Sequence, residues 1–85
     1  MLSRERAELS FLQQEESTIK QKISSYEERI EDFNLTLKDN PEVDQTYGLQ
    51  EIYFLETVIR SLKIKLESVK AKSLKLLEKE YASSS

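Results

Sequence analysis

Paired carboxylates are the residues of this chain whose types and spacing come closest to a chemical site. The pairs are Glu15-Glu16, Glu27-Glu28 and Glu31-Asp32. Two carboxylates that converge could share a proton or hold a metal ion. Neighbouring residues of a helix, however, point about 100° apart, because one turn takes about 3.6 residues. If these segments are helical, we therefore expect no catalytic or metal-binding pair.

The residue types that usually carry catalysis are missing. The chain has no histidine and no cysteine, which removes the commonest acid–base residue at neutral pH and excludes disulfides and thiolate metal sites. There is also no glycine-rich phosphate loop and no nucleophile beside a base. The sequence predicts a protein that is not an enzyme and that has no cofactor, no metal and no small-molecule substrate.

Length and composition indicate long helices in one small domain. The chain has 85 residues with one glycine and one proline, and 34% of its residues are charged. A domain of this size buries little apolar surface, so oligomerisation or binding to a partner is the expected source of stability. The first residues are charged, and no apolar run approaches the roughly 20 residues needed to cross a bilayer. We expect an intracellular protein, cytoplasmic or nuclear.

Apolar residues recur with a heptad spacing on both sides of Asn40-Pro41. This predicts helix one over about 3–38, a turn over about 39–43, helix two over about 44–81 and a flexible tail over 82–85. Asn40 with Pro41 is a good start signal for helix two, and Asp44 is a second candidate cap. A single helix kinked at the proline is the alternative to two helices, and such a proline costs about 3 kcal/mol.

The two ladders mirror each other, which favours a hairpin. In every facing pair the residue numbers add up to 85, so the chain folds back beside Pro41. The predicted fold is all-α: an antiparallel two-helix coiled-coil hairpin, assembled into a four-helix bundle or a larger helical complex. At the tip, Leu37 should face the lone Gly48. The predicted seam consists of Leu9, Leu12, Ile19, Ile23, Tyr26, Ile30, Phe33, Ile52, Leu55, Ile59, Leu62, Leu66, Val69 and Leu76.

Three facing pairs of the seam contain polar residues. Glu16 faces Val69, Ser73 faces Leu12, and Glu5 faces Glu80, where we expect the end of the hairpin to fray. A buried glutamate without a partner is costly. Glu16 could reach water and a lysine, either Lys20 or Lys72, as long charged side chains often do. Alternatively, the seam loosens at this point and another chain enters.

Helix two has more apolar residues than the seam can use. A helix that is apolar on several sides is usually buried on several sides. We therefore predict a partner-binding surface on helix two and the hairpin tip. Its candidate residues are Leu35, Tyr47, Tyr53, Phe54, Val58, Ile64, Leu74, Leu77 and Tyr81. The aromatic residues near the tip suit an interface, although plain bundle core has the same composition.

The predicted function is that of a non-enzymatic coiled-coil assembly or scaffold module. The partner is protein, either a second copy in a homodimer or other helices in a hetero-oligomeric complex. The alternative function uses the stretch Lys63–Lys79, whose lysines could bind nucleic acid, an anionic membrane or a cytoskeletal polymer. A solvated helix face, partly neutralised by Glu8, Glu15 and Glu16, is the simpler explanation of these lysines. The net charge of −3 argues against nucleic acid as a partner, and we expect neither nucleic acid nor membrane to bind.

Overall fold

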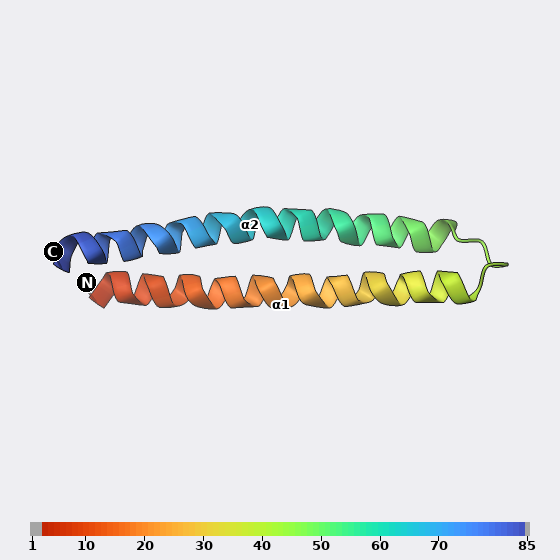
Figure 1. Cartoon of the computed structure of the whole chain (residues 1–85), viewed down its shortest axis with the longest axis horizontal. Helices are drawn as coiled ribbons and strands as arrows, with labels where there is room; N and C mark the ends of the chain where they lie inside the picture. The colour runs from red at the N-terminus through yellow and green to blue at the C-terminus, as the bar shows by residue number, and fades with distance from the viewer. Residues whose placement is uncertain (1–2, 85) are drawn as a thin grey trace.

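Residues 3–84 form two antiparallel helices and the turn that joins them, and the helices lie side by side along their whole length (Figure 1). The computed structural model describes the backbone of these residues and, except at Tyr81, Ser83 and Ser84, their side chains. The first helix, α1, spans Ser3–Asp39, and the second, α2, spans Thr46–Ser84. The molecule is a rod of 66 × 17 × 14 Å, with the start of α1 and the end of α2 at the same end. The chain is thus a helical hairpin, and a single kinked helix is excluded.

The heptad ladders supply the buried core of the hairpin. Ile19 and Val69 are the best-buried side chains, each 3% exposed. The other buried apolar residues are Leu12, Ile23, Ile52, Leu55, Ile59, Leu66 and Leu76. The remaining seam residues, Leu9, Tyr26, Ile30, Phe33 and Leu62, are half-buried. Since burying one such apolar side chain stabilises a fold by about 1.5–3 kcal/mol, the seam is the main source of contact between the helices.

The lone glycine lies directly against Leu37 of α1 near the tip. A Cβ atom at Gly48 would lie 2.8 Å from Cδ2 of Leu37 and 3.2 Å from its Cδ1. Only glycine therefore fits against Leu37 without a shift of that side chain. The predicted facing of Leu37 and Gly48 is confirmed, and with it the register of the two ladders at this end.

The turn between the helices differs from the predicted one in its details. The Val43 amide donates to the carbonyl of Asn40 at 3.2 Å, which closes a turn with Pro41 at its second position. The Asn40 side chain donates back to the carbonyl of Thr36 at 2.8 Å and so caps the end of α1. The prediction that Asn40-Pro41 starts helix two is therefore wrong, because both residues belong to the turn that follows α1.

Helix α2 begins instead after Asp44, the second candidate cap. Oδ1 of Asp44 accepts from the Thr46 backbone N–H at 3.0 Å and from the Thr46 hydroxyl at 2.7 Å. The bond to the hydroxyl, followed by the bond to the backbone, lowers the pKa of Asp44 below 3.8. The carbonyl of Gln45 accepts the first helical bond, from Leu49 at 2.9 Å. The turn therefore covers residues 40–45 rather than 39–43.

At its other end, α2 continues beyond the predicted boundary. The predicted flexible tail began at residue 82, but α2 runs to Ser84. No proline or glycine stands in this segment, and alanine is the strongest helix former. Nothing in the local sequence therefore stops the helix at Tyr81. Ser85, the last residue of the predicted tail, lies outside the described residues.

The polar residues Glu16 and Ser73 are accommodated in the seam in different ways. The Glu16 side chain is 23% exposed and contacts Nζ of Lys20 at 3.2 Å, which confirms one of the two predicted partners. Ser73 is buried, and within the described part of the chain its hydroxyl has no hydrogen-bond partner. Entry of another chain at Glu16 stays a prediction.

Candidate protein–protein interface

Exposed apolar side chains concentrate on α2. Within the described residues, two large exposed apolar side chains, Phe11 and Leu35, come from α1, and Val43 comes from the turn. The others all belong to α2: Tyr47, Leu49, Tyr53, Phe54, Ile64 and Leu74. Two of the predicted partner-binding residues, Val58 and Leu77, are half-buried instead. The side chain of Tyr81 lies outside the described residues.

A groove beside the seam near the hairpin tip brings three of the predicted partner-binding residues together with aromatic residues of the seam. We call it the tip groove; it is lined by Tyr26, Arg29, Phe33, Tyr47, Glu51, Phe54, Leu55 and Val58. Tyr47 and Phe54 are 71% and 62% exposed. A second hollow, lined by Arg29, Asp32, Phe33 and Thr36, shares two residues with the groove and continues it along α1.

The tip groove combines apolar rings with one charge from each helix. Arg29 comes from α1 and Glu51 from α2. Exposed aromatic rings bury a large area on binding, and an arginine at the rim can pair with a carboxylate of a partner. Such a groove can receive apolar side chains from another helix.

Sequence reasoning missed part of this groove. Tyr26 and Phe33 occur at seam positions and were therefore predicted only to hold the hairpin together. Both are half-buried, because a ring at the margin of a narrow seam leaves one edge uncovered. Two aromatic residues in seam positions, placed by the register near Tyr47 and Phe54, were the available signal.

The other predicted residues on α2 do not join the tip groove. Tyr53 directly precedes Phe54 in the sequence and therefore points about 100° away from it on the helix. Tyr53 and Ile64 are each 69% exposed, and Leu74 is 57% exposed. Together with Leu49 and Leu77 they form a second surface, which we call the outer face of α2. The predicted partner-binding set thus divides into two surfaces, and Leu35 on α1 lines neither of the grooves beside it.

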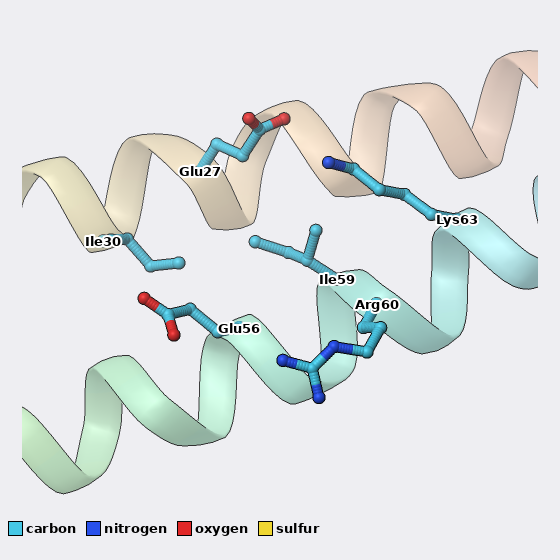
Figure 2. A pocket seen from close by; sticks show the side chains of 6 residues that line it. All are labelled: Glu27, Ile30, Glu56, Ile59, Arg60 and Lys63. Atoms are coloured by element: carbon cyan, nitrogen blue, oxygen red, sulfur yellow. The ribbon is translucent and has the colours of Figure 1, made fainter.

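A third hollow lies on the opposite edge of the seam, and Figure 2 shows its lining. Ile30 and Ile59 belong to the seam, and charged residues stand around them: Glu27, Glu56, Arg60 and Lys63. The Lys63 side chain extends along the edge toward Glu27, whereas Arg60 points away from α1 (Figure 2). Because charges of both signs surround a small apolar area, this hollow favours no ligand class.

The lysines of α2 do not share one face. Lys63 borders the hollow with Glu27 and Glu56, and Lys65, two residues later, points about 200° away. Nζ of Lys65 contacts Glu15 at 3.7 Å, and Nζ of Lys70 contacts Glu67 at 3.8 Å. The geometry therefore adds no support to a nucleic-acid, membrane or polymer surface at these lysines, and that function stays an untested prediction.

No group of acidic side chains in the described residues is arranged to hold a metal ion. Within the same residues, neither helix has an apolar stretch long enough to cross a membrane.

Comparisons of the chain with protein-family models, with curated proteins and with solved structures found no match. The case for a function therefore rests on the surfaces of α2.

Proposed function

We propose that the chain is a non-enzymatic coiled-coil assembly module, which associates with other protein helices through α2 and the hairpin tip. α1 covers one side of α2 and leaves its other sides to solvent. In the assembled state, α2 is the inner helix of a four-helix bundle or of a larger helical complex.

One observation carries this proposal: the large exposed apolar side chains lie mainly on one helix. A surface helix of a stable monomer has one apolar stripe, which faces its own core. α2 has that stripe in the seam and, in addition, an aromatic groove on one side and the outer face on another. Exposed apolar and aromatic side chains that gather on one helix are typical of protein interfaces.

The partner is either a second copy of the chain or helices of a different subunit. A homodimer predicts a stable, well-folded protein with twice the monomer mass. A subunit of a hetero-complex predicts a chain that is poorly ordered by itself and becomes helical and soluble when it is produced with its partner.

Substitution of exposed aromatic residues tests the proposal. Phe54→Glu places a charge in the tip groove, and Tyr53→Glu places one on the outer face. Both side chains are exposed, so the hairpin seam should persist and the helical circular dichroism signal should remain. We expect at least one variant to reduce the mass measured by sedimentation equilibrium toward that of a monomer.

Ser68→Glu is the matched control, since Ser68 is an exposed polar residue of α2 that belongs neither to the tip groove nor to the outer face. It should change the mass less than the aromatic variants do. If the wild-type protein associates and neither aromatic variant alters its mass, α2 and the tip are not the interface.

A further inference from the structure

The outer face of α2 has a row of residues that is complementary to a second, antiparallel copy of itself. Tyr53, Arg60, Glu67 and Leu74 are spaced by seven, so they lie along one side of the helix. All four are exposed. The row is apolar at its ends, with one basic and one acidic residue between them. An antiparallel copy would place Tyr53 opposite the partner's Leu74 and Arg60 opposite the partner's Glu67, and two-fold symmetry would make each contact twice.

The rows on either side of this one match in the same alignment. On one side, Leu49 meets the partner's Leu77, and Glu56 meets the partner's Lys70. On the other side, Ile64 meets its own symmetry mate, and Thr57 meets the partner's Ala71. Apolar residues face apolar or small ones, and acidic residues face basic ones, around an axis that passes between Lys63 and Ile64.

Lys63 is the one residue of these rows that meets a like charge in this alignment, because it lies beside the axis. Its side chain extends toward Glu27 of α1, while Arg60 projects away from α1 (Figure 2). The Lys63 side chain is thus directed toward its own α1 helix, which leaves Arg60 as the positive charge available to a partner on the outer face.

The charges in these three rows favour the antiparallel orientation. Between Leu49 and Leu77 they are Glu56, Arg60, Lys63, Glu67 and Lys70. An antiparallel copy places Glu56 against the partner's Lys70 and Arg60 against the partner's Glu67, whereas a parallel copy places each of these charges against its own counterpart.

We propose that the occupant of the outer face is a second copy of this chain, packed antiparallel to the first with α2 against α2 and the two α1 helices outside. This inference rests on the proposed assembly function and specifies its partner. The tip groove lies on another side of α2 and remains open in such a dimer.

Charge exchange at Arg60 and Glu67 tests the pairing. Arg60→Glu and Glu67→Arg each create two like-charge contacts in the symmetric dimer, so each variant alone should weaken the dimer at least about tenfold. The double variant restores opposite charges at both contacts and should return the dissociation constant to near the wild-type value. An equimolar mixture of the two single variants should form a heterodimer, because one copy then has glutamate at both positions and the other has arginine.

Glu28→Arg is the control, since it reverses an exposed charge on α1 and should leave the dimer unchanged. Circular dichroism checks that every variant is helical. Orientation is measured by pulsed electron paramagnetic resonance with a spin label at Ser61 or at Lys75. Antiparallel packing separates the two Lys75 labels by about 35 Å along the axis and the two Ser61 labels by under about 10 Å, at 1.5 Å per residue; parallel packing gives similar distances for both.

The outcomes separate this inference from the proposed function. A wild-type dimer in which the double variant and the mixture fail to restore association overturns the antiparallel pairing and leaves the assembly function standing. A chain that is unfolded alone and folds only with a different subunit likewise overturns the antiparallel pairing and leaves the assembly function standing. A folded wild-type monomer at high micromolar concentration overturns both.

Discussion

At the scale of single residues, the seam contains one position that opposes stability. Ser73 is 8% exposed, and its hydroxyl has no partner in the described residues. A buried polar group without a hydrogen bond costs about 1–3 kcal/mol. The hairpin therefore keeps a polar atom where a heptad ladder would normally place an apolar side chain.

Ser73→Ala should raise the free energy of unfolding by about 1 kcal/mol, because it removes the unpaired hydroxyl and improves helix propensity. Urea unfolding at one fixed protein concentration measures the change. Ser68→Ala, at an exposed position of the same helix, reports the propensity gain alone. Equal effects of the two substitutions would show that the Ser73 hydroxyl carries no burial cost.

A second residue-scale prediction concerns Gly48 and Leu37. Gly48→Ala gains about 1 kcal/mol in helix propensity, but its Cβ would lie 2.8 Å from Cδ2 of Leu37. In a Leu37→Ala background this obstacle is gone, so Gly48→Ala should be more stabilising there by on the order of 1 kcal/mol. A double-mutant cycle from urea unfolding measures the difference, and strictly additive effects would contradict the register at the tip.

At the scale of elements, the ladders were enough to predict the hairpin and its register, because heptad spacing and antiparallel packing are general rules. The start of α2 was harder to predict, since Asn40 and Asp44 are equally good caps by residue type. The structure distinguishes them by their bonds: the Asn40 side chain bonds back to Thr36, and Asp44 bonds forward to Thr46. Such a choice depends on where the turn places each side chain.

The tip groove was only partly predictable for a related reason. Tyr47, Phe54 and Val58 could be identified as surplus apolar residues by counting around the helix. Tyr26 and Phe33 could not, because their heptad positions belong to the seam and only their size leaves part of each ring uncovered. Sequence periodicity assigns a residue to a face but does not say how much of a large side chain the neighbouring helix covers.

The cap of α2 has a pH dependence whose direction follows from its bonds. The side-chain and backbone bonds from Thr46 hold the pKa of Asp44 below its ordinary value of 3.8. A lowered pKa means that the cap contributes stability above the unfolded-state pKa and loses it as the pH falls through the folded-state pKa. The start of α2 should therefore persist near pH 4 and fray in stronger acid.

Side-chain NMR titration measures this pKa directly. We expect a midpoint below 3.8 for Asp44 in the wild-type chain. In Thr46→Ala the side-chain bond is lost and the backbone bond remains, so the midpoint should rise toward the ordinary value. An unchanged midpoint in that variant would mean that the hydroxyl bond does not act on Asp44.

At the scale of the whole molecule, the hairpin is a rod of 66 × 17 × 14 Å with a thin core. α1 uses nearly all of its large apolar residues in the seam, whereas α2 keeps the tip groove and the outer face in solvent. A two-helix rod covers each helix on one side only, so association is the available way to bury the rest of α2.

The mass of the purified chain in solution tests this account most directly. Sedimentation equilibrium across micromolar concentrations, with a thermal melt by circular dichroism on the same samples, measures assembly and folding together. For a dimer that packs α2 against α2, we expect a cooperatively melting helical protein with twice the 10.0 kDa chain mass. A cooperatively folded monomer of 10.0 kDa throughout that range would contradict it.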